Sequence, residues 1–143
     1  MNNSSTICVD AGLVVRRVVI PQDAAIQAIW EQWATSQTQL TAPTLLRYEV
    51  TNALYQYQKT GALSAVAAHQ ALRAAFVLPL SLIEDADLSS EALNIAGRFS
   101  LPAAYDAHYL ALAKRLGATF VTTDQRLVNA VQSALPWVRM AGT

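Results

Sequence analysis

Short apolar runs alternate with longer amphipathic stretches along the chain, and this alternation is the main guide to the fold. Five runs have the length and composition of buried strands, over residues 6–9, 40–42, 78–83, 118–122 and 138–141. Between them, apolar positions spaced by three and four residues predict helices over 22–38, from after Pro43 to before Gly61, and over 64–76, 89–99, 103–116 and 124–134.

Strands that alternate with helices around one core indicate a parallel sheet covered by helices on both faces. In this α/β class, ligands collect at the carboxyl ends of the strands. A chain of 143 residues suits one compact domain, and we see no linker, repeat or low-complexity segment that divides it. We therefore expect a single α/β domain over residues 1–143.

Composition narrows the class of protein. Hydrophobic residues make up 53% of the chain, which is enough for a real core. No apolar run approaches the ~18–20 residues of a membrane-spanning helix, and the first residues lack the pattern of a secretory signal. The single cysteine, Cys8, has no intrachain partner, which suits a reducing compartment. These features predict a cytoplasmic protein.

The net charge gives no direct sign of a polyanionic partner. Ten basic and ten acidic residues cancel, so no global field attracts nucleic acid. Any such binding would depend on local basic pairs, such as Arg16 with Arg17 or Lys114 with Arg115.

Two acidic residues lie at the predicted carboxyl ends of strands. Asp10 follows the run 6–9 directly, and Asp124 comes just after the run 118–122. Because parallel strands end at the same edge of a sheet, both side chains are expected at the edge where ligands bind.

Two further acidic residues lie on helices, next to apolar positions. Glu49 lies beside the core stripe that contains Leu46 and Val50. Asp106 lies near the start of a helix that is apolar almost all round, and Arg115 is too far round this helix to pair with it. An unpaired charge in such surroundings is costly, so each needs an explanation.

Each of the four acids also has a purely structural explanation. Asp10 and Asp124 could cap the helices that follow them, Glu49 could pair with Arg47 or another cation, and Asp106 could accept a hydrogen bond from a loop amide. Together, however, four acids at one end of a sheet repel each other unless cations neutralise them. Oxygen ligands suit Mg²⁺ or Mn²⁺, and no Cys/His cluster suggests zinc. Ions held in this way can activate water and orient a phosphodiester, so metal-dependent hydrolysis is the chemistry that we expect.

The segments around the four acids resemble the four motifs of PIN domains, in the form found in toxins of VapBC-type toxin–antitoxin pairs. These segments are residues 9–11, 49–54, 105–113 and 122–127, which follow the order and spacing of the family over nearly the whole chain. The stretch from Tyr105 to Leu127 is the most specific part.

The resemblance implies a PIN-like three-layer α/β/α sandwich, with a parallel sheet of about five strands, and a Mg²⁺- or Mn²⁺-dependent endoribonuclease. It also implies a cognate antitoxin that inhibits the enzyme and, commonly, a homodimer. Matched motif by motif, the catalytic and metal-holding residues would be Asp10, Glu49, Asp106 and Asp124. Asn52 and Thr122 would be supporting groups that orient carboxylates or water.

One position departs from the family pattern. Gly12 stands two residues after the first Asp, where the family usually carries Ser or Thr. The missing hydroxyl favours one alternative, a PIN-fold binding protein with weak catalysis. A second alternative is a housekeeping RNA-processing nuclease without an antitoxin, which the absence of a neighbouring antitoxin reading frame would indicate.

Overall fold

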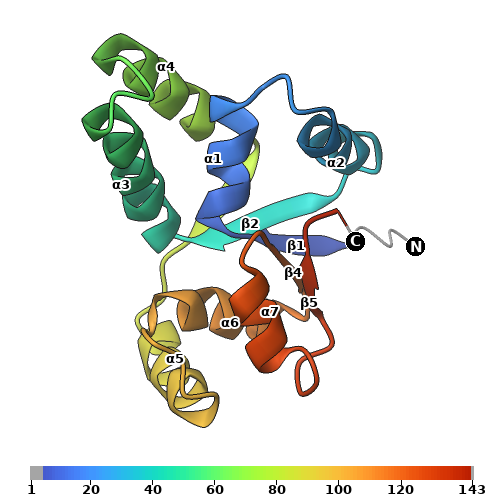
Figure 1. Ribbon diagram of the computed structural model, residues 1–143. Coiled ribbons are helices and arrows are strands. Elements are labelled where there is room, and N and C mark those ends of the chain that lie inside the picture. The colour runs from blue at the N-terminus through green and yellow to red at the C-terminus, as the bar shows by residue number, and fades with distance from the viewer. Residues whose placement is uncertain (1–4, 143) are drawn as a thin grey trace.

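A computed structural model, which describes residues 5–142, has a five-stranded parallel sheet between two layers of helices (Figure 1). The strands lie in the order β3-β2-β1-β4-β5, and every neighbouring pair is parallel. Their bounds are Thr6–Val9 for β1, Gln39–Pro43 for β2, Leu80–Ile83 for β3, Thr119–Thr122 for β4 and Val138–Met140 for β5. The five predicted strands are therefore confirmed, to within two residues at each end. Residues 1–4 and 143 of the expected domain lie outside the described residues.

Seven helices in the described part of the chain form the two outer layers, as Figure 1 shows. One face of the sheet carries α1 (Ala11–Val19), α2 (Ala24–Thr35), α3 (Leu45–Lys59) and α4 (Ala65–Phe76). The other face carries α5 (Asp87–Arg98), α6 (Tyr105–Leu116) and α7 (Gln125–Val131). This arrangement confirms the three-layer α/β/α sandwich. None of these helices combines the length and apolar character needed to cross a bilayer.

Local signals in the sequence set several helix ends. The side chain of Asp23 accepts hydrogen bonds from two backbone amides at the start of α2, and the hydroxyl of Ser64 accepts one, from the amide of Ala67, at the start of α4. Gly117 ends α6 in the left-handed conformation, with a φ of 62°, which glycine adopts without steric cost.

Helix α1 is the element that the sequence pattern did not reveal. Four of its nine residues are valine, a residue that favours strands over helices. Nine residues are also too few to show a clear helical spacing of apolar positions. Packing decides its conformation, because Leu13, Val14 and Val15 are buried. Arg16 and Arg17 lie in its last turn, where positive charge interacts favourably with the helix dipole.

The chain leaves the carboxyl ends of β1 and β4 in opposite directions. After β1 it enters α1 and continues towards β2, whereas after β4 it enters α7 on the other face and continues towards β5 (Figure 1). In open α/β sheets such a reversal opens a crevice between the two strands, and ligands bind there. Asp10 follows β1 directly, and Asp124 lies two residues after the end of β4.

Candidate functional site

Asp10 is buried at the carboxyl end of β1, with a side chain that joins three segments. Its Oδ1 accepts a hydrogen bond from the amide of Leu13 at 2.8 Å, so it caps α1. Its Oδ2 accepts from the Thr122 hydroxyl at 2.5 Å, and from the amide and hydroxyl of Thr123 at 3.0 and 3.4 Å. Burial raises the pKa of the carboxyl, although these hydrogen bonds oppose the rise. The capping explanation is confirmed, but it accounts for only one of the two oxygens.

Thr122 connects the two acids that follow strands. This residue is 1% exposed, and its hydroxyl donates to Asp10 and accepts a hydrogen bond from the amide of Asp124 at 3.0 Å. Asp124 caps α7 with its Oδ1, which accepts from the amides of Arg126 and Leu127 at 3.0 and 3.2 Å. A threonine that holds a carboxylate in one orientation fits the supporting role predicted for Thr122.

Glu49 is fixed by a tyrosine on the opposite helical layer. Its Oε1 accepts a hydrogen bond from the hydroxyl of Tyr109 at 2.6 Å, and it forms no ion pair with Arg47 or any other described residue. Burial raises the pKa of Glu49, and the bond from Tyr109 partly offsets the rise. We did not single out Tyr109 from the sequence. Its signal is a hydroxyl three residues after Asp106 on an otherwise apolar helix.

Asp106, in the first turn of α6, differs from the other three acids because no described residue donates a hydrogen bond to it. Its pKa rises from 3.8 to about 6, first through burial and then through the negative charges of Asp124, Glu49 and Asp10. Asp106 therefore lies close enough to the other three acids for their negative charges to raise its pKa. The loop-amide explanation for Asp106 is wrong.

The remaining polar candidates have smaller roles in the structure. Asn52 is exposed and forms no hydrogen bond with a described residue, so its supporting role stays a prediction. His108 is hydrogen-bonded through Nδ1 to the carbonyl of Ala104 at 2.7 Å, and its Nε2 lies 3.4 Å from the hydroxyl of Ser89. Arg115 forms ion pairs with Asp85 and Glu91, so it is not free for a polyanion.

The chemistry of these side chains fits a hard divalent cation, although their present positions do not form a ready cage. Within residues 5–142, no three Asp, Glu, His or Cys side chains lie together as metal ligands. Several carboxylate oxygens accept no hydrogen bond from described residues: both of Asp106, Oε2 of Glu49 and Oδ2 of Asp124. Such free oxygens are the ligands that Mg²⁺ and Mn²⁺ prefer, and a cation would offset the repulsion that raises the pKa of Asp106.

The raised pKa of Asp106 predicts how stability depends on pH. The pKa of Asp106 is higher in the folded protein, about 6, than its ordinary value of 3.8. An acid of this kind binds its proton more tightly when folded, so the free energy of unfolding rises as pH falls from about 7 towards 4. Solvent screens a half-buried site, which leaves an expected gain of about 1–2 kcal/mol from Asp106. Urea unfolding in chelator at pH 7.5 and pH 5 measures it, and a lower stability at pH 5 than at pH 7.5 would contradict the raised pKa of Asp106.

Comparisons with known proteins agree with the fold described above. Residues 7–131 match the family model described as the PIN domain. Among solved structures, PAE2754 from Pyrobaculum aerophilum is similar with a TM-score of 0.70 and 25% identity, over 95% of this chain and 84% of that one. No protein of curated function matches the sequence.

Two other similar structures come from bacteria and show likeness of fold. A toxin–antitoxin complex from Klebsiella pneumoniae aligns with a TM-score of 0.66 and 16% identity, over 92% of this chain and 94% of that one. VapC20 from Mycobacterium tuberculosis, a toxin that cleaves the sarcin–ricin loop, aligns with a TM-score of 0.64 and 17% identity, over 87% and 95% of the two chains.

Proposed function

The chain belongs to the PIN domain family, and from this premise we propose that it is a metal-dependent endoribonuclease that acts as the toxin of a toxin–antitoxin pair. The observation that carries the proposal is that Asp106 lies under the negative charge of Asp10, Glu49 and Asp124, near the carboxyl ends of β1 and β4, where the chain continues to opposite faces of the sheet. We further propose a single PIN domain over residues 1–143, which acts in the cytoplasm and forms a homodimer.

The four acids are proposed to hold Mg²⁺ or Mn²⁺. A bound ion would activate water for attack on the phosphodiester and neutralise charge that develops on the phosphate. Hydrogen bonds from neighbouring residues hold two of these carboxylates in place: Thr122 and Thr123 donate to Asp10, and Tyr109 donates to Glu49. Asp106, which accepts no hydrogen bond from a described residue, could turn towards an ion without breaking one.

Cleavage of RNA tests this function. We expect the purified chain to cut RNA with Mn²⁺ or Mg²⁺, and to stop in chelator. Asp10→Asn should abolish cleavage, because it removes the charge; its amide oxygen can still cap α1, while its NH₂ group takes the place of the oxygen that accepts from the N–H of Thr123. Gel analysis of a structured RNA, with the 5′ ends of the fragments mapped, measures both effects. Cleavage that persists in chelator or in the Asp10→Asn variant would overturn the proposal.

The proposed antitoxin follows from the same charges. A segment that covers four carboxylates is expected to offer them an Arg or Lys, because a cation replaces the ion and removes the repulsion. The native complex should therefore contain a second chain, and Asp106→Asn should weaken its affinity. Calorimetry of the reconstituted complex measures the change. An antitoxin that leaves the four carboxylates uncovered, and that binds the wild type and Asp106→Asn with equal affinity, would contradict this arrangement.

A further inference from the structure

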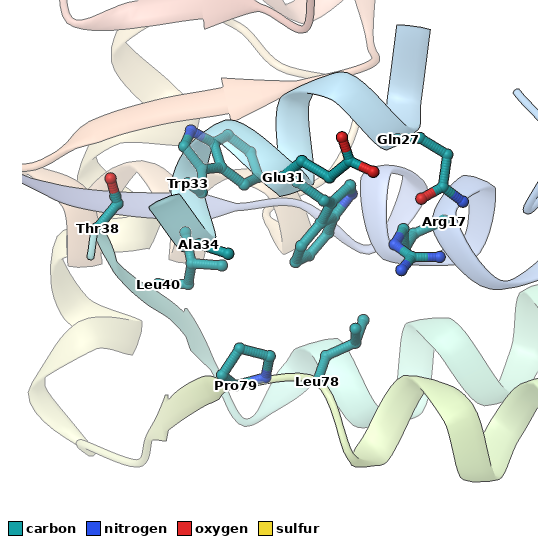
Figure 2. Close-up of a pocket in the computed structure, with 10 residues that line it drawn as sticks. Arg17, Gln27, Glu31, Trp33, Ala34, Thr38, Leu40, Leu78 and Pro79 are labelled. Carbon is teal, nitrogen blue, oxygen red and sulfur yellow. The ribbon is translucent and has the colours of Figure 1, made fainter. Parts of the chain in front are cut away.

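Two cavities lie at opposite ends of strands β2 and β3. One, of about 230 Å³, is lined by Thr38, which precedes β2, and by Leu78 and Pro79, which precede β3 (Figure 2). The other, of about 440 Å³, is lined by Pro43 and Ile83, the last residues of the same strands, which are paired in the sheet. Because ligands bind at the carboxyl ends of parallel strands, the second cavity is the candidate for a ligand site.

This second cavity lies beside the four acids. Asp10 follows β1, which pairs with β2, and neighbouring strands are about 4.8 Å apart, so the end of β3 is about 10 Å along the sheet edge from the end of β1. His108, which lines the cavity, lies two residues after Asp106 on α6 and is close enough to Glu49 to interact with its charge. This distance is within the reach of a nucleotide that flanks the cleaved bond.

Hydrogen-bond acceptors line the cavity. Nδ1 of His108 donates to the carbonyl of Ala104 at 2.7 Å, so in the neutral ring Nε2 can only accept. This Nε2 lies 3.4 Å from the hydroxyl of Ser89, which lines the same cavity, and the distance is longer than that of a usual hydrogen bond. The exposed side chain of Glu84 forms no ion pair with a described residue, and Asp85 adds a second carboxylate to the lining. Nε2 of His108 and the carboxylate of Glu84 are therefore acceptors that a ligand can use.

The lining favours an uncharged ring over a phosphate. Two carboxylates repel an anion. Apart from Thr44, the rest of the lining is apolar: Pro43, Leu45, Ile83, Ala86 and Leu88. The volume lies within the ~300–1,000 Å³ that is usual for ligand sites. Among the parts of a nucleotide, the base combines a flat apolar face with N–H donors, and it carries no charge.

We propose that this cavity binds an unpaired nucleobase of the RNA next to the cleaved bond, and that it prefers bases with an exocyclic amine. The N–H groups of such an amine would donate to Nε2 of His108 and to the carboxylate of Glu84. Adenine, guanine and cytosine carry an exocyclic amine, and uracil does not. Because a base must leave its helix to enter a cavity, the substrate would be a single strand or a loop. This inference rests on the proposed function, which supplies the RNA.

Titration with nucleosides tests the inference without cleavage or metal. The chain contains two histidines, and the ring C–H signals that disappear from the proton NMR spectrum in His69→Gln belong to His69. We expect cytidine and adenosine to shift the His108 signals saturably, with half-saturation at roughly millimolar concentration, and to leave those of His69 on α4 in place. Uridine, which has a carbonyl where cytidine has the amine, should bind at least about 5-fold more weakly.

Two pairs of variants locate the binding. Ala86→Leu should fill part of the cavity and weaken cytidine binding at least about 5-fold, whereas Ala65→Leu, at an exposed alanine that begins α4, should not. Glu84→Gln should narrow the difference in affinity between cytidine and uridine, because glutamine also offers a donor, and Glu31→Gln on α2 should leave the difference unchanged. Since Glu84 is exposed, this second pair decides the question if Ala86→Leu does not fold.

Mapped cleavage sites separate this inference from the proposed function. Uridine should be depleted at one fixed position beside the cut, and Ala86→Leu should remove the depletion. If the chain cuts no RNA, the proposed function fails, and saturable cytidine binding would still support a nucleobase site. Equal affinity for cytidine and uridine, or cuts without base preference, would overturn the inference even where metal-dependent cleavage is present. A shift of the His108 signals by an antitoxin and by no nucleoside would also overturn it, and would make the cavity part of a protein interface.

Discussion

Asp106→Asn is expected to abolish RNA cleavage and yet leave the metal-free protein as stable as the wild type, or more stable. Cleavage should fall by at least about 100-fold, because changing even a partner of a metal ligand costs ~10–100-fold. Stability should not fall, because Asp106 accepts no hydrogen bond from a described residue and is repelled by Asp124, Glu49 and Asp10. Removing this charge, which is desolvated by burial and repelled by its neighbours, is expected to raise the free energy of unfolding by about 1–2 kcal/mol in chelator at pH 7.5.

Asp85→Asn provides the matched control. Asp85 is also an acid near the start of a helix, but it forms an ion pair with Arg115 and accepts a hydrogen bond from the amide of Asp87 at 2.9 Å. Its loss should lower stability by up to about 1 kcal/mol and leave cleavage unchanged. Thermal melts in chelator and the RNA assay compare the two variants. A destabilised Asp106→Asn protein that still cuts RNA would make Asp106 a structural residue and remove the proposed site.

The strands and most helices could be predicted because their signals are local. A buried strand of a parallel sheet is a short apolar run, and the structure places strands on all five such runs. Gly117 and Ser64 mark helix ends with one residue each. Helix α1 could not be predicted in this way, since its valines favour a strand and only its burial against α3 and α4 makes it helical.

The candidate acids could be found for a related reason, and their partners could not. A position one or two residues after a strand places Asp10 and Asp124 at the ligand-binding edge whatever the order of the strands. Glu49 and Tyr109, by contrast, are 60 residues apart and lie on opposite layers of the sandwich. Nothing in the local sequence of either helix indicates the hydrogen bond between them.

Gly12 shows how a three-dimensional contact changes the meaning of a sequence departure. From the sequence, glycine at this position means the loss of a hydroxyl. In the structure, a Cβ atom at Gly12 would lie 2.4 Å from the hydroxyl oxygen of Thr123, which itself lies 3.4 Å from Oδ2 of Asp10. Thr123 thus places a hydroxyl beside Asp10 in the space that a side chain at position 12 would take. Weak catalysis therefore does not follow from Gly12 alone.

Gly12→Ala is accordingly expected to destabilise the protein, although alanine favours helices. Gly12 lies in α1, where replacing glycine should gain up to about 1 kcal/mol through helix propensity. The close approach to Thr123 should cost more, about 1–3 kcal/mol, because the threonine must turn and release Asp10. We expect a net loss of stability of about 1 kcal/mol, together with a loss of cleavage. Urea unfolding and the RNA assay measure the two effects.

Two backgrounds separate the contact with Thr123 from other causes. In Thr123→Ala, which removes the hydroxyl and its neighbouring methyl group, Gly12→Ala should stabilise the protein by up to about 1 kcal/mol. In Thr123→Val, which keeps the shape of threonine without its hydroxyl, the same change should still destabilise it, because the crowding remains. The difference between the two backgrounds is the coupling between positions 12 and 123, expected to be at least about 1 kcal/mol. An effect of Gly12→Ala that is the same in all three backgrounds would show that Thr123 does not occupy the space beside Asp10.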